Sequence, residues 1–264
     1  MKTRLNGLEL AYDDHGVGQP MIFLHAFPLN RSMWDYQTRT LLAEQRFRLV
    51  TLDWRGFGAS DIATNVSTME DFADDVAGLM DQLGMQQAIL CGLSMGGYAI
   101  FAFLRKYPQR VKGLILADTK PEADNAATQA SRAQVAQLAL SQGAEAIAEQ
   151  QIPRLLSQYT REQQPGIELH VRHMINCALT QGIAAAARGM ARRADATDLL
   201  ASIDCPTLVI AGEHDSITPP SMVCAWAEQV GNAQFSVIPR AGHLSNLEQP
   251  EAFTTIVQNF LYNL

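Results

Sequence analysis

The chain has 264 residues, long enough for one sizeable core with a small insertion. Its net charge of -7 at pH 7 argues against nucleic-acid binding, which needs a basic surface. No apolar run is long enough to span a bilayer, and residues 1–16 lack the apolar core of a signal peptide, so we expect a soluble, cytoplasmic protein without a membrane partner. The four cysteines are widely spaced, fit no metal-binding pattern and favour a reducing compartment.

Apolar runs predict strands, and apolar residues at helical spacing predict helices. In chain order, strands are expected at 8–12, 21–24, 47–52, 88–91, 111–117, 207–211 and 235–238. Helices are expected at 69–83, 98–107, 220–230 and 250–261. Ser67 and Glu70 have the spacing of a capping box for the first helix, and Pro108 is expected to close the second. The alternation of strands and helices predicts an α/β fold with a mostly parallel sheet, which binds ligands at the carboxyl ends of its strands.

The alternation breaks between about residues 121 and 202. This region is alanine-rich and helical in pattern, and Pro153 and Pro165 divide it into several expected helices. It is too long to be a connecting loop. We therefore predict a core of residues 1–120 and 203–264 and an inserted helical cap of residues 121–202 above the strand ends.

The segment Gly92-Leu93-Ser94-Met95-Gly96 stands between an expected strand and an expected helix. This G-x-S-x-G pattern is typical of a nucleophile elbow, a tight turn that exposes the serine hydroxyl at its apex. Side chains at the two glycine positions would collide with the neighbouring strand and helix. Ser94 is thus the candidate nucleophile.

A serine hydroxyl is a weak nucleophile and needs a base, usually a histidine that a carboxylate holds in position. His243 is the best candidate base, because it follows the last expected strand in a turn-like setting. Asp215 is the favoured acid, at the end of the strand 207–211. Asp118 competes with it because it also ends a strand, and Glu213 is a weaker candidate.

The negative charge of a tetrahedral intermediate requires preorganised N–H donors. The backbone N–H of Met95, after the nucleophile, and that of Phe27, after the strand 21–24, are the expected oxyanion donors. His25 is expected to be a structural hydrogen-bonding residue. His170 and His173 lack a third ligand, so we expect no metal.

Five motifs in this order resemble the α/β-hydrolase superfamily, and they span nearly the whole chain outside the expected cap: His25-Ala26-Phe27-Pro28, Asp53-Trp54-Arg55-Gly56-Phe57-Gly58-Ala59-Ser60, Gly92-Leu93-Ser94-Met95-Gly96-Gly97, Gly212-Glu213-His214-Asp215 and Ala241-Gly242-His243. The chain looks most like small bacterial carboxylesterases and is similar to enol-lactonases and cofactor-free haloperoxidases. The resemblance implies the α/β-hydrolase fold, the triad Ser94, Asp215 and His243, and oxyanion donors at Phe27 and Met95. One position departs from the family, where a glycine usually stands in place of Ala26. Asp53 and Arg55 belong to a loop motif that we interpret as structural.

These features predict a serine carboxylic-ester hydrolase that forms an acyl-enzyme on small to medium acyl or aryl esters, without metal or organic cofactor. A lactonase, a carbon–carbon bond hydrolase and a perhydrolase share the triad and are the enzyme alternatives. A non-catalytic ligand receptor on the same fold is a more remote alternative. The only expected partner is a small ester or lactone, and the oligomeric state stays open. The expected cap offers apolar side chains and several arginines for the pocket, at Leu138, Leu155, Met174, Leu179, Met190, Arg154, Arg172, Arg188 and Arg192.

Overall fold

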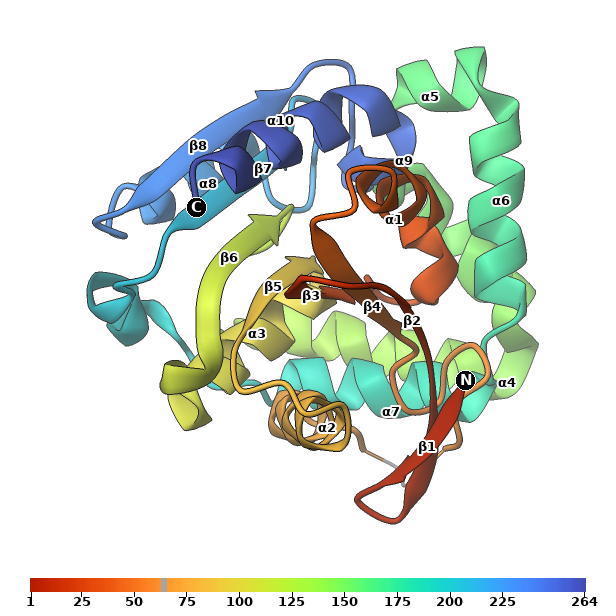
Figure 1. Ribbon diagram of the computed structural model, residues 1–264. Helices are drawn as coiled ribbons and strands as arrows, with labels where there is room; N and C mark the ends of the chain where they lie inside the picture. Colours follow the sequence, from red (N-terminus) through yellow and green to blue (C-terminus); the bar gives the residue numbers. More distant parts are fainter. Residues whose placement is uncertain (63–65) are drawn as a thin grey trace.

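The computed structural model describes residues 1–62 and 66–264, which form an eight-stranded sheet flanked by helices (Figure 1). The strands lie in the order β1-β2-β4-β3-β5-β6-β7-β8. The six strands from β4 to β8 run parallel, while β1 and β2 are antiparallel at one edge. Their bounds are β1 Lys2–Leu5, β2 Leu8–Gly16, β3 Gln19–Leu24, β4 Phe47–Leu52, β5 Ala88–Leu93, β6 Val111–Ala117, β7 Thr207–Gly212 and β8 Ala233–Ile238.

The helices cover both faces of this sheet. Figure 1 shows α1 and α10 on one side and α2 and α3 on the other, and both pairs are in contact. The helices are α1 Asp35–Leu42, α2 Met69–Gln82, α3 Met95–Lys106, α4 Ala126–Leu155, α5 Gln158–Gln163, α6 Pro165–Asn176, α7 Thr180–Ala191, α8 Pro220–Ala227, α9 Ser245–Glu248 and α10 Pro250–Tyr262. Every residue of β5 and β7 is buried, as the apolar runs predict for central parallel strands. The mostly parallel sheet expected from the sequence is confirmed.

The chain leaves β3 to form β4 on one side and then returns to form β5 on the other side of β3. The strand order therefore reverses between β3 and β5, and the loops that follow these two strands diverge at their carboxyl ends. In parallel α/β sheets this is where ligands bind. Phe27 follows β3 and Ser94 follows β5, so both lie at the reversal point.

The expected N-terminal cap of α2 differs from the structure. The sequence favoured Ser67 and Glu70 as a capping box, but Thr68 is the N-cap of α2 and Asp71 completes the box one residue later. The Thr68 hydroxyl accepts a hydrogen bond from the Asp71 N–H at 3.1 Å, and the Asp71 carboxylate accepts one from the Thr68 N–H at 2.8 Å. Ser67 lies one residue before this cap, and its N–H donates to the Ala185 carbonyl of α7 at 3.1 Å.

Four helices, α4 to α7, fill the segment between β6 and β7, and α4 packs along α7 (Figure 1). The expectation that Pro153 separates two helices is wrong, because Pro153 lies in the last turn of α4. The break in this long helix is at Gly143, whose φ of 87° is not helical and suits a residue without a Cβ. Whether residues 121–202 form a separate cap domain stays a prediction. Among the described residues, none of the helices is both long and apolar enough to cross a membrane.

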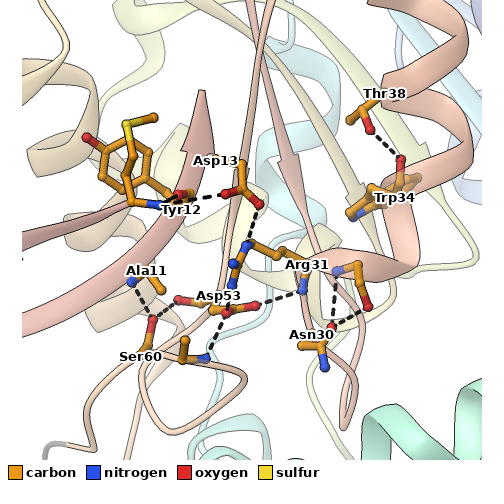
Figure 2. A network of polar contacts seen from close by, with 12 residues as sticks. Ala11, Tyr12, Asp13, Asn30, Arg31, Trp34, Thr38, Asp53 and Ser60 are labelled. Carbon is orange, nitrogen blue, oxygen red and sulfur yellow. Dashed lines mark hydrogen bonds and ion pairs between the residues drawn. The ribbon is translucent and has the colours of Figure 1, made fainter. Parts of the chain in front are cut away.

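A buried carboxylate connects the segments that follow β3 and β4, next to strand β2 (Figure 2). Asp53 accepts hydrogen bonds from the N–H groups of Arg31 at 2.8 Å and Ala59 at 2.9 Å, and it forms an ion pair with the Arg31 guanidinium. Ser60 donates to the Asp53 carbonyl at 2.7 Å and accepts from the Ala11 N–H at 2.8 Å. These bonds fix the loop that carries Phe27 to the neighbouring strands, so Asp53 acts here as a structural brace.

Candidate active site

Ser94 stands alone between the end of β5 and the start of α3, in a conformation that few residues adopt. Its φ of 53° and ψ of -111° indicate a strained turn. The turn is tight because a Cβ at Gly92 would lie 2.6 Å from the carbonyl carbon of Gly96, and a Cβ at Gly96 would lie 2.1 Å from the Leu24 oxygen. The two glycines are therefore required by contact, as the elbow pattern predicts.

Ser94, His243 and Asp215 come from three loops at the carboxyl end of the sheet and form one hydrogen-bonded chain. The Ser94 Oγ lies 2.8 Å from His243 Nε2, and His243 Nδ1 lies 2.7 Å from Asp215 Oδ2. All three side chains are buried, and Ser94, at 8% exposed, is the most accessible. Asp215 also accepts from the N–H groups of Ile217 at 2.7 Å and Thr218 at 3.1 Å, which hold its carboxylate facing the imidazole.

The charges within this chain set the tautomer of the histidine. Burial would raise the pKa of Asp215, but the His243 charge and several hydrogen bonds outweigh it and lower that pKa, so the carboxylate is ionised. Burial likewise opposes a charged His243, but the neighbouring Asp215 carboxylate prevails and raises the pKa of the imidazole above 6.5. A carboxylate only accepts, so Nδ1–H donates to Asp215 and the free Nε2 accepts from the serine hydroxyl. This is the arrangement in which a serine can lose its proton to a base.

The three candidate acids differ in their hydrogen-bond partners. Asp118 does not bond the imidazole. Its carboxylate accepts from the Gly212 N–H at 2.7 Å and from the Ser245 hydroxyl, so it connects the end of β7 to the start of α9. Burial, together with the nearby Asp215 charge, raises the pKa of Asp118 well above its usual value. Glu213 is exposed and accepts from the Arg240 N–H at 2.8 Å.

A second buried carboxylate, which the sequence analysis missed, fixes the loop of the histidine. Glu248, 1% exposed, accepts from the N–H groups of Gly242 at 2.8 Å and Leu244 at 3.3 Å, on either side of His243. Its other oxygen accepts from the Ser157 N–H at 2.8 Å and the Thr160 hydroxyl at 2.7 Å, at the start of α5. Glu248 therefore joins the loop of the base to the helical segment. No local sequence pattern marks this role, because its partners are mainly backbone groups.

The expected oxyanion donors lie at the ends of adjacent strands. Neither the Phe27 N–H nor the Met95 N–H has an acceptor among the described residues, so both are free to bind a ligand oxygen. His25 orders the first of these loops. Its Nδ1 lies 2.9 Å from the Ala26 carbonyl and its Nε2 accepts from the Trp54 N–H at 3.0 Å, which fixes the tautomer with the proton on Nδ1. Burial lowers the pKa of His25 to about 4, so it stays neutral in this structural role.

Alanine at position 26 is compatible with this loop. Ala26 is fully buried and its φ is not positive, so the Cβ that replaces the usual glycine hydrogen causes no backbone strain. His170 and His173 lie on α6, and His173 Nε2 is 3.6 Å from the Cys177 sulfur. In residues 1–62 and 66–264, no three His, Cys, Asp or Glu side chains are grouped to hold a metal ion.

The chain is similar to known proteins over most of its length. The family model described as alpha/beta hydrolase fold matches residues 19–250. The structure of a thermophilic esterase from Thermogutta terrifontis, solved with malate bound, is 44% identical and superimposes with a TM-score of 0.96 over 100% of this chain and 98% of that one. The 3-oxoadipate enol-lactonase 2 of Acinetobacter baylyi is 30% identical over 97% of this chain and 95% of its own length. A Synechocystis protein provisionally named non-heme chloroperoxidase is 30% identical over 96% and 95%.

Proposed function

The chain belongs to the alpha/beta hydrolase fold family, and from this premise we propose that it is a serine carboxylic-ester hydrolase acting through an acyl-enzyme on small to medium acyl or aryl esters. One observation carries the proposal, the unbroken hydrogen-bonded chain from Asp215 through His243 to Ser94. The similarity to the Thermogutta terrifontis esterase supports ester hydrolysis as its chemistry.

The first half of the reaction forms the acyl-enzyme. As the Ser94 Oγ attacks the ester carbonyl carbon, its proton passes to His243 Nε2, and the ionised Asp215 stabilises the imidazolium. The carbonyl oxygen becomes an oxyanion that accepts from the N–H groups of Phe27 and Met95, each worth about 3–4 kcal/mol of barrier in comparable sites. Collapse of this intermediate expels the alcohol, which takes the proton from His243.

The second half releases the acid. Water gives a proton to His243 Nε2 and attacks the acyl carbonyl, and the oxyanion forms again at the same two N–H groups. Its collapse breaks the bond to Ser94 Oγ, which recovers its proton from His243. Every proton in both halves moves through one imidazole atom, so no further acid or base is required.

A lactonase is the second candidate, favoured by the 30% identity to an enol-lactonase. A lactone is a cyclic ester, so the same triad opens it, and the alcohol then stays attached to the acyl group. Carbon–carbon bond hydrolysis and perhydrolysis remain further alternatives.

The test is turnover of p-nitrophenyl esters of increasing acyl length by the wild type and Ser94→Ala. We expect serine-dependent release of p-nitrophenol that falls off with chain length, and a folded but inactive variant, because Ser94 supplies the atom that becomes acylated. Equal turnover by Ser94→Ala would refute the assignment. A single burst that does not continue, with the acid retained, would instead support a receptor. Lactones tested in the same way decide between the two enzyme candidates.

A further inference from the structure

A cleft lies beside the triad, between the loop after β6, the helix α4 and the loop of Asp215. Its volume is about 320 Å³, at the lower end of the range for small-molecule sites. Lys120, Arg132 and Arg154 bring three positive charges to its lining, and Asp124 brings the only negative one among its lining residues. Such a concentration of cations is unexpected in a chain whose net charge is -7.

The single carboxylate of this cleft is already neutralised. Asp124 forms ion pairs with Arg132 at 3.2 Å and with the buried Arg193 at 2.7 Å. Lys120 and Arg154, in contrast, have no ion pair or hydrogen-bond partner for their side chains within the described part of the chain. Lys120 is half-buried and Arg154 is exposed, so both cations are accessible to a ligand.

Lining residues of the cleft, or their neighbours in the sequence, are hydrogen-bonded to all three triad residues. On the side of the nucleophile, the Tyr98 N–H donates to the Ser94 carbonyl at 3.1 Å, and Thr119, which precedes Lys120, donates its hydroxyl to the same carbonyl at 2.9 Å. Tyr98, a lining residue of the cleft, is therefore hydrogen-bonded to the backbone of the elbow.

The other walls adjoin the acid and the base. The N–H of Ile217, a lining residue, donates to Asp215 at 2.7 Å. The residue after Arg154, Leu155, accepts from the His243 N–H at 3.0 Å. Lys120, in the loop after β6, and Arg154, near the end of α4, thus line one cleft whose surrounding backbone is hydrogen-bonded to the triad residues.

From this arrangement we infer that Lys120 and Arg154 form a carboxylate-binding subsite, and that the substrate is an ester or lactone whose acyl part carries a second, ionised carboxylate. The inference rests on the proposed function and narrows its substrate class. A carboxylate placed between a guanidinium and an ammonium gains charge-assisted hydrogen bonds that a neutral acyl chain cannot make. The rest of the lining includes apolar groups such as Val135 and Ile217, which suit the methylene chain between the two ends.

The experiment compares mono-p-nitrophenyl adipate with p-nitrophenyl hexanoate, which has the same acyl chain without the terminal carboxylate. The variants are Lys120→Met, Arg154→Leu and the double variant. Arg192→Leu is the matched control, because Arg192 is an exposed arginine at the end of α7 that does not line the cleft. The measured quantity is the ratio of kcat/KM for the two esters, at low and high salt.

We expect each single substitution to lower this ratio about threefold to fivefold, mainly through KM, as for accessible charge pairs worth up to about 1 kcal/mol. The double variant lowers it further, and salt lowers it in the wild type because accessible charges are screened. Hexanoate kinetics and the control Arg192→Leu stay within about twofold of the wild type, less than the effect of one such pair. A ratio unchanged in the double variant, or lowered equally by Arg192→Leu, overturns the inference.

The two proposals fail in distinguishable ways. Serine-dependent hexanoate hydrolysis with an unchanged ratio leaves the esterase standing and removes the subsite. If the wild type hydrolyses neither ester, the proposed function fails, and calorimetric titration with the adipate dianion still tests the subsite. Adipate binding that the double variant loses supports the subsite, and no binding to the wild type overturns it. A hemiester series from glutarate to suberate then measures how far the subsite lies from Ser94.

Discussion

Replacing Glu248 by glutamine is expected to loosen the joint between the loop of the base and the helical segment. The carboxylate accepts four hydrogen bonds, from Gly242, Leu244, Ser157 and Thr160. A glutamine amide has one oxygen and one NH₂ group, so it can keep the two bonds on one side only. With the amide oxygen kept toward Gly242 and Leu244, the NH₂ group faces the Thr160 hydroxyl, which can turn and accept a hydrogen bond. The same NH₂ group also faces the Ser157 N–H, which is a donor and cannot accept one.

The loss of unfolding free energy follows from the number of hydrogen bonds that the substitution removes. One hydrogen bond to a charged acceptor is lost and one buried N–H is left unsatisfied, which together cost about 2–3 kcal/mol. Since about 1 kcal/mol moves the melting temperature of a chain of this size by about 2–4 °C, the expected decrease is about 4–12 °C. Glu248→Ala leaves all four donors without their acceptor and costs about 4–6 kcal/mol. Because these hydrogen bonds also position His243, the kcat of the Glu248 variants is expected to fall by about tenfold to a hundredfold.

Urea unfolding gives the change in free energy, and hydrogen exchange at the Ser157 amide, compared with the Gly242 amide whose acceptor is kept, locates it. Glu149→Gln, at an exposed position in the last third of α4, removes the same charge without touching the joint and serves as the control. The reasoning is refuted if Glu248→Gln unfolds at the same urea concentration as this control, or if exchange rises elsewhere but not at the Ser157 amide.

Two further predictions concern the base and the helix cap. His243 must be neutral to take the serine proton, and Asp215 raises its pKa, so kcat/KM is expected to fall as the pH drops through a midpoint above 6.5. Asp215→Asn should move that midpoint to lower pH and lower kcat about ten-thousandfold. A midpoint that does not move in this variant would contradict the pairing of Asp215 with His243. Thr68→Ala should cost about 1 kcal/mol of unfolding free energy in urea, and Ser67→Ala less, because only the Thr68 hydroxyl accepts from Asp71; equal losses would argue against this cap.

The elbow and the strands could be predicted from the sequence because their determinants are local. The G-x-S-x-G spacing around Ser94 marks the turn in the sequence, where Gly92 is required by its contact with Gly96, and short apolar runs such as 88–91 indicate buried strands. The hairpin of β1 and β2 was missed although Asn6-Gly7, with φ of 48° and 87°, is a typical two-residue hairpin turn. Its short first strand is mostly exposed and carries little apolar signal.

The choice of acid and the determinants of the cleft are not local. Asp118 and Asp215 both end a parallel strand, and only the position of the last loop decides which carboxylate meets the imidazole. Of the arginines considered for the pocket, Arg154 reaches the cleft, whereas Arg172 pairs with Glu145 and Glu168. Which arginines reach the cleft depends on how α4 to α7 pack, and their sequence specifies this packing only weakly.

The hydrogen bond from Ser94 to His243 joins residues 149 positions apart in the chain. A nascent chain that ends before position 243 can form the elbow but has no base, so synthesis reaches an active protein only after β8 has been made. Contacts of such large separation also form slowly, because a long loop must close before they add stability. Appearance of esterase turnover during refolding would therefore mark the completion of the sheet, later than the recovery of helical signal.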